Sequence, residues 1–118
     1  MTFKSFETLV KIKTQESQSK LPPKFADWVI VINEGIKRIN DEIKITINSE
    51  KIEIKTTDLL ETDADDIPII EDLTIALVYY ISQMYVSYIT LKQKYLLDYS
   101  DEIGIFVWNK FKEMESNR

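Results

Sequence analysis

The stretch from Leu73 to Leu91 constrains the fold of this chain more than any other feature of the sequence. It reads LTIALVYYISQMYVSYITL and holds no charged residue, although charged residues make up 30% of the 118-residue chain. Wrapped on a helix, its large apolar side chains cover every side and leave no polar face for water. We therefore expect a central helix that is surrounded by protein, in part by a neighbouring subunit, because so small a domain cannot cover it alone.

The same stretch is just long enough to cross a bilayer as a helix. Polar residues interrupt it throughout, and its tyrosines lie through the middle rather than at the ends, where membrane proteins place them. We expect no membrane span.

The composition excludes several classes of function. The chain has no cysteine and no histidine, which rules out disulfides, thiol nucleophiles, thiolate zinc sites and Ser/His relays. The net charge is −5, and an acidic surface repels phosphate backbones. We expect no catalytic, cofactor or metal site and no sequence-specific nucleic-acid binding. The start MTFKSFETLV also lacks the layout of a secretion signal.

Apolar spacings of three and four predict two helices in the first third of the chain. The first covers residues 3 to about 14, with Thr2 as its cap, and a polar linker with Pro22 and Pro23 follows it. The second covers residues 24–43, where we expect Gly35 to allow another helix to approach closely.

The period then changes from helical to two. Isoleucines alternate with polar residues on both sides of a polar turn, which predicts a β-hairpin around residues 44–55 with a contact face of Ile45, Ile47, Ile52 and Ile54. Seven acidic residues follow between Asp58 and Asp72. They lack the glycine and the closing glutamate of an EF-hand, so we interpret them as a solvated acidic loop.

The central helix is expected to begin near Pro68 and to end in a turn between Tyr88 and Lys92; a break at Asp98 to Ser100 is the alternative. A last helix extends to about Met114. The predicted fold is mostly α, a small bundle of three to four helices with one β-hairpin. It forms a single domain over 1–118, in which 1–20 is a short helix with a polar linker and 22–118 is the helical core.

All six tyrosines fall between residues 79 and 99, and tyrosine suits a subunit interface because it buries a large area and keeps a hydroxyl for a partner. A tyrosine stripe at helical spacing is also typical of a plain core, and that alternative stays open. The residues predicted for a subunit interface are Tyr79, Tyr85, Val86, Tyr88, Ile89, Tyr95, Tyr99 and Trp108.

Two parts of the chain resemble the head-to-tail connector, or adaptor, proteins of phages. WVIVINEGIKRINDEI (28–43) is similar to their tryptophan-bearing helix with an Asn-Glu step. IPIIEDLTIALVYYISQMY (67–85), followed by KYLLDYSDEIGIFVWNKF (94–111), is similar to their second half, in which a proline-led acidic loop enters an Ala-Leu-Val-Tyr-Tyr helix. The chain departs from that pattern in its first helix and in its isoleucine hairpin.

The resemblance implies a structural virion protein, a small helical bundle that forms a homo-oligomeric ring. The ring would lie between the portal protein and the tail or further connector proteins, would let DNA pass without specific binding, and would be assembled in the host cytoplasm. A cytosolic helical interaction module, dimeric or bound to a partner, is the alternative. An enzyme or a single-pass membrane protein is less favoured by the same residues.

Overall fold

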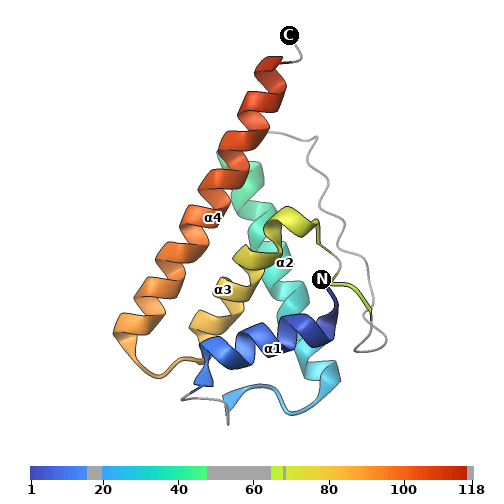
Figure 1. Ribbon diagram of the computed structural model, residues 1–118, viewed down its shortest axis with the longest axis vertical. Helices are drawn as coiled ribbons and strands as arrows, with labels where there is room; N and C mark the ends of the chain where they lie inside the picture. The colour runs from blue at the N-terminus through green and yellow to red at the C-terminus, as the bar shows by residue number, and fades with distance from the viewer. Residues whose placement is uncertain (16–19, 48–64, 68, 117–118) are drawn as a thin grey trace.

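The structure is a computed structural model that describes residues 1–15, 20–47, 65–67 and 69–116. These residues form four α-helices: α1 (Phe3–Lys13), α2 (Phe25–Ile47), α3 (Thr74–Tyr85) and α4 (Ile89–Ser116). One turn of 3-10 helix, η2 (Glu71–Leu73), leads into α3. Helix α3 packs against each of the other three helices and so lies at the centre of the bundle. The long α4 runs along it (Figure 1).

Helix α1 begins and docks as its sequence predicts. The Thr2 hydroxyl accepts a hydrogen bond from the Ser5 N–H at 3.2 Å, which caps the helix, and the predicted helix over residues 3 to about 14 is confirmed. A three-turn helix is marginal by itself, and its buried stripe of Phe3, Phe6 and Val10 supplies the tertiary packing that it needs. The Phe3 N–H also donates to the Asp65 carbonyl at 2.8 Å, which ties α1 to the segment before α3.

Helix α2 is longer than predicted, and this corrects the expected hairpin. Residues 44–47, which include Ile45 and Ile47, continue the helix instead of starting a strand. Ile47 lies four residues after Ile43 and so continues the helical spacing of the buried Ile36, Ile39 and Ile43, whereas Ile45 fits the period of two alone. The other half of the hairpin, with Ile52 and Ile54, lies outside the described residues, among which no strand occurs.

Gly35 marks the closest approach of α2 to α3. A Cβ atom at this position would lie 2.6 Å from Cδ1 of Leu77 and 3.4 Å from Cδ1 of Tyr80. Since Leu77 is fully buried, the missing side chain is what lets the two helices meet there. The predicted close approach is confirmed.

The uncharged stretch does not form one helix. Helix α3 ends at Tyr85, Val86 is extended with φ −83° and ψ 143°, and α4 begins at Ile89. The break therefore comes slightly earlier than predicted, and Asp98 to Ser100 lie inside α4. At this break the chain turns back, and α4 packs along α3 (Figure 1).

The turn changes what surrounds the central helix. Ala76, Leu77, Val78 and Ile81 of α3 are completely buried, and the residues that cover them belong to the same chain. The expectation that this stretch carries more apolar surface than its own chain can cover therefore holds only in part. The other three helices cover one side of α3, whereas Ile75, Met84, Tyr88 and Ile89 stay exposed. No helix in the described part of the chain is long and apolar enough to cross a membrane.

Candidate functional site

Half of the large apolar side chains that are exposed in the described part of the chain lie on α4. About a third of the circumference of this helix carries no charged residue over roughly six turns. We call this side the uncharged α4 face, and its exposed or partly exposed members are Ile89, Thr90, Gln93, Leu96, Leu97, Ser100, Gly104, Trp108 and Phe111.

Several side chains of this face are more than half exposed. The exposed fraction is 71% for Ile89, 62% for Leu97 and 60% for Trp108, and Leu96 and Phe111 are also exposed. Single exposed apolar residues are ordinary on protein surfaces, but a contiguous row of them marks an interaction site. The Lys112 ammonium lies 5.2 Å from the Trp108 ring centroid, so a cation–π contact within the helix holds one edge of this row.

The opposite side of α4 fixes the orientation of the uncharged face. The Tyr95 hydroxyl donates a hydrogen bond to the Lys13 carbonyl at 2.9 Å, which joins α4 to the end of α1. The Lys13 ammonium lies 4.6 Å from the Tyr79 ring centroid and 5.7 Å from that of Tyr95. Burial raises the pKa of both tyrosines.

A second tyrosine joins α4 to α2. The Tyr99 hydroxyl donates to the Glu42 carboxylate at 2.9 Å, and its ring lies 5.4 Å from that of Tyr80. Burial, together with this hydrogen bond, raises the pKa of Tyr99 well above its usual range. Tyr95 and Tyr99 thus bond the buried side of α4 to α1 and α2, and the members of the uncharged face lie on the exposed side of the helix.

The structure separates the eight residues that the sequence predicted for an interface. Tyr88, Ile89 and Trp108 are exposed, and Tyr79, Tyr85 and Val86 are partly buried. Tyr95 and Tyr99 are only 8% and 4% exposed, and the side chains and carbonyl that they contact belong to this same chain. We therefore leave these two out of the interface proposed below.

Leu96, Leu97, Ser100 and Phe111 were not predicted for the interface, because the sequence reasoning followed the tyrosines. The signal was present, since positions 97, 100, 104, 108 and 111 repeat at helical spacing without a charge.

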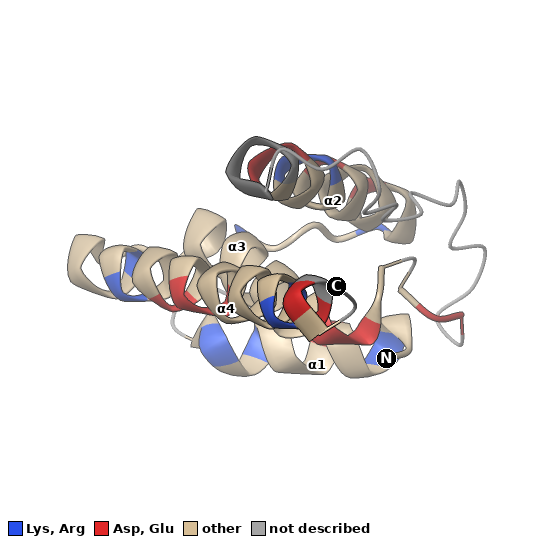
Figure 2. Ribbon diagram, turned by 90° about the horizontal axis from the view of Figure 1, so that it is seen from above, with Lys and Arg blue, Asp and Glu red and all other residues tan. Residues whose placement is uncertain are grey.

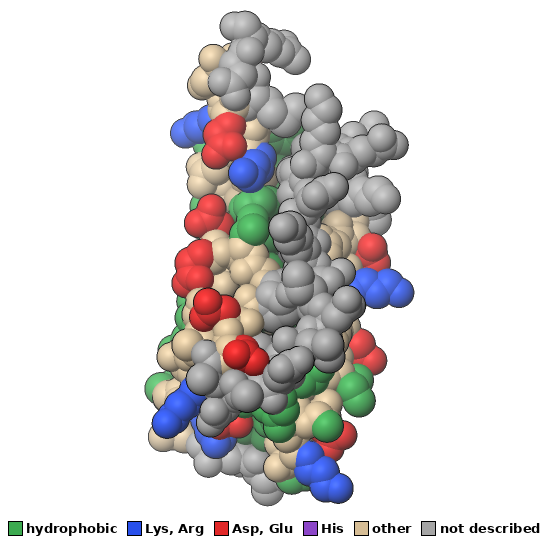
Figure 3. Space-filling view, turned by 90° about the vertical axis from the view of Figure 1, so that its right-hand side faces the viewer, with side chains coloured by type: hydrophobic (Ala, Val, Ile, Leu, Met, Phe, Trp, Pro, Cys, Tyr) green, Lys and Arg blue, Asp and Glu red, His purple; other side chains and the backbone are tan. Residues whose placement is uncertain are grey.

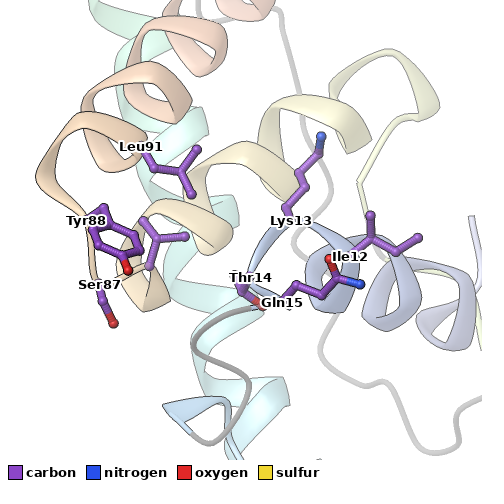
Figure 4. A pocket seen from close by; sticks show the side chains of 8 residues that line it. Ile12, Lys13, Thr14, Gln15, Ser87, Tyr88 and Leu91 are labelled. Carbon is purple, nitrogen blue, oxygen red and sulfur yellow. The ribbon is translucent and has the colours of Figure 1, made fainter.

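A shallow groove of about 190 Å³ lies at the N-terminal end of α4. Figure 4 shows Ile12 to Gln15, from the end of α1, on one side of it and Ser87, Tyr88 and Leu91 on the other. The Lys20 ammonium lies 3.1 Å from the Ser87 hydroxyl, which ties the segment after α1 to the turn between α3 and α4. The groove is lined by both apolar and polar side chains. It is a recessed surface at the N-terminal end of the uncharged α4 face.

A second cavity, of about 160 Å³, lies between η2 and α4, where Asp72, Glu102 and Glu113 contribute carboxylates. The Lys110 ammonium pairs with Glu113 at 3.3 Å. The described residues hold no cluster of three or more side chains arranged to bind a metal ion.

Charge on the surface is mixed, with acidic residues in excess. Basic and acidic residues are interspersed on α4 when the molecule is seen along its long axis (Figure 2). On the side shown in Figure 3, acidic side chains follow one another down the left part of the view. Among the described residues, neither view shows a continuous basic track.

No protein-family model, no curated protein and no solved structure matches this chain.

Proposed function

We propose that this protein is a structural assembly subunit that acts through contacts with other protein chains and has no catalytic activity. More specifically, we propose a head-to-tail connector subunit that forms a ring between the portal and the tail of a phage particle. The observation that carries the proposal is the uncharged α4 face, because one side of a helix that bears five exposed apolar side chains and no charge is costly to leave in water.

The sequence resemblance supplies the specific role within that class. The resemblance includes residues 94–111, which belong to α4 and contain most of the uncharged face. The net charge of −5 also suits a conduit, since every contact that neutralised a phosphate would hold the passing DNA.

Ring geometry requires two different contact patches on each subunit, because a head-to-tail interface joins unlike surfaces. The uncharged α4 face and the groove between Ile12 and Tyr88 are two such surfaces in this chain. A cytosolic helical interaction module, dimeric or bound to a partner, is the second candidate. The continuous face on a single helix favours it, because one such face is enough to bind one partner helix.

The proposal is tested by deleting the gene from the phage or prophage that carries it and imaging the resulting lysate by electron microscopy. We expect heads and tails that do not join. Complementation with the wild-type gene should restore whole particles, whereas Leu97→Glu should not, because it places a charge on the uncharged face.

Ile30→Glu is the matched control, since Ile30 is similarly exposed but lies on α2. It should restore particles as the wild type does. Whole, infectious particles in the absence of the gene would contradict the connector role.

A further inference from the structure

Gly104 has no explanation within a single subunit. A Cβ atom at Gly35 would collide with Leu77, but a Cβ atom at Gly104 would meet nothing within 4 Å. Glycine inside a helix weakens it, and here the fold gains nothing in return. Gly104 also lies in the middle of the uncharged α4 face, so the open space above it is space for another backbone.

We infer that the uncharged α4 face pairs with the same face of a second copy of this chain, the two α4 helices running antiparallel and crossing at Gly104. The inference rests on α4 alone and goes beyond the connector role. A two-fold pair is closed and uses one patch twice, so it leaves the groove beside Tyr88 free.

The sizes of the side chains along the face are complementary in this arrangement. Ser100 and Trp108 each lie four residues from Gly104, and Leu97 and Phe111 each lie seven residues from it. An antiparallel crossing at Gly104 therefore sets Trp108 of each copy opposite Ser100 of the other, and Leu97 opposite Phe111. Small residues at the centre let the backbones approach, and the large ones close the contact at both ends.

The charges at the two ends of the face favour the antiparallel direction. Lys94 lies beside its N-terminal end and Glu115 beside its C-terminal end, and both are exposed. An antiparallel pair brings Lys94 of each copy near Glu115 of the other. In a parallel pair Lys94 of each copy would lie level with Lys94 of the other, far from Glu115, and this ion pair could not form.

The extent of the face sets the strength of pairing. From Ile89 to Phe111 the helix rises about 33 Å and is about 10 Å wide, so each copy offers on the order of 300–400 Å². Stable interfaces bury about 800 Å² on each side, so we expect a weak dimer. Such a dimer forms at high concentration and separates when a stronger partner competes.

The direction of pairing is tested by disulfide cross-linking of the full chain, which contains no cysteine of its own. Leu97→Cys and Phe111→Cys are prepared separately, one of them with a size tag, and then oxidised alone and as a mixture. We expect the mixture to cross-link about tenfold faster than either variant alone, because positions 97 of the two copies are about 21 Å apart in the antiparallel pair. Equal cross-linking by each variant alone would mean a parallel pair and would overturn the inference. The inference would also be overturned if the mixture cross-linked no faster than the Ile30→Cys variant does by itself.

The role of Gly104 is tested by light scattering on Gly104→Leu. The substituted side chain projects into open space in the single subunit, so circular dichroism and the melting temperature should show a folded helix that is no less stable. We expect the dimer Kd to rise by at least about tenfold. A Kd within about twofold of the wild-type value, or a wild-type protein that stays monomeric up to about 1 mM, would overturn the inference. Neither result would contradict the connector role, because that role is tested separately by particle assembly.

Discussion

The hydroxyl of Tyr99 donates a hydrogen bond to the Glu42 carboxylate at 2.9 Å, joining α4 to α2 across 57 residues of sequence. Glu42 also accepts a hydrogen bond from the guanidinium of Arg38, one turn earlier on α2, at 2.9 Å. The Tyr99 side chain is buried, so its hydroxyl has exchanged water for this one charged acceptor. This contact sets the rotation of α4 and therefore the direction in which the uncharged face points.

Removing the hydroxyl should destabilise the bundle. Tyr99→Phe keeps the ring and its packing but loses a hydrogen bond to a charged group, and we expect the free energy of unfolding to fall by about 1–3 kcal/mol. Urea denaturation measures the change. Tyr88→Phe is the matched control, because Tyr88 is exposed, and it should change stability by less than about 0.5 kcal/mol. Equal effects of the two variants would contradict the role assigned to the contact.

The raised pKa of Tyr99 predicts a loss of stability at alkaline pH. Burial and the hydrogen bond to Glu42 raise this pKa, whereas tyrosine in the unfolded chain titrates near 10. Above that pH the unfolded chain gives up its proton first, so the stability present below pH 10 is lost as the pH rises toward the folded pKa. Above pH 10 we expect the unfolding free energy of Tyr99→Phe to fall less steeply with pH than that of the wild type. The two slopes should differ by up to about 1.4 kcal/mol per pH unit. A slope equal to that of the wild type would contradict the shift.

The two glycines should respond in opposite directions to the same substitution. Gly35→Ala places a Cβ atom against the buried Leu77 and should lower the free energy of unfolding by about 1–3 kcal/mol. Gly104→Ala fills open space on a helix and should raise the stability of the isolated subunit by up to about 1 kcal/mol. Thermal denaturation at low concentration compares the two. A destabilising Gly104→Ala would show that the helix is packed there within one subunit.

Ser82 carries a buried hydroxyl that finds no hydrogen-bond partner among the described residues. An unpaired buried polar group costs free energy, and alanine also forms helices better than serine. Ser82→Ala should therefore raise the free energy of unfolding by about 0.5–2 kcal/mol in urea denaturation. A loss of stability instead would indicate that the hydroxyl bonds a group in the chain or a buried water.

The helices could be predicted from the sequence where an amphipathic stripe met a clear start signal. Thr2 before Phe3 and Phe6 predicted α1, and the stripe from Trp28 to Ile43 predicted most of α2. The hairpin prediction failed at Ile45 and Ile47, because Ile43 and Ile47 are four residues apart and so fit a helix as well as an alternating strand.

The site was harder to predict than the helices. No proline or glycine marks the end of α3. The sequence therefore predicted a single helix over the uncharged stretch up to Leu91, with an excess of apolar surface. Which helix keeps an exposed face depends on the turn at residues 86–88, since that turn folds α4 over α3. Tyr95 and Trp108 are both large aromatic residues of α4. The first is buried and the second is exposed, because α4 packs against the bundle with the side that bears Tyr95.

The central claim is that the uncharged α4 face is where this protein meets other protein chains. Hydroxyl-radical footprinting with mass spectrometry tests it, comparing Trp108 in the dilute isolated subunit with Trp108 in the assembled complex or particle. The exposed Ile30 on α2 provides an internal reference. We predict that Trp108 loses most of its reactivity on assembly relative to Ile30. A Trp108 that reacts as readily in the assembly as in the isolated subunit would contradict the account.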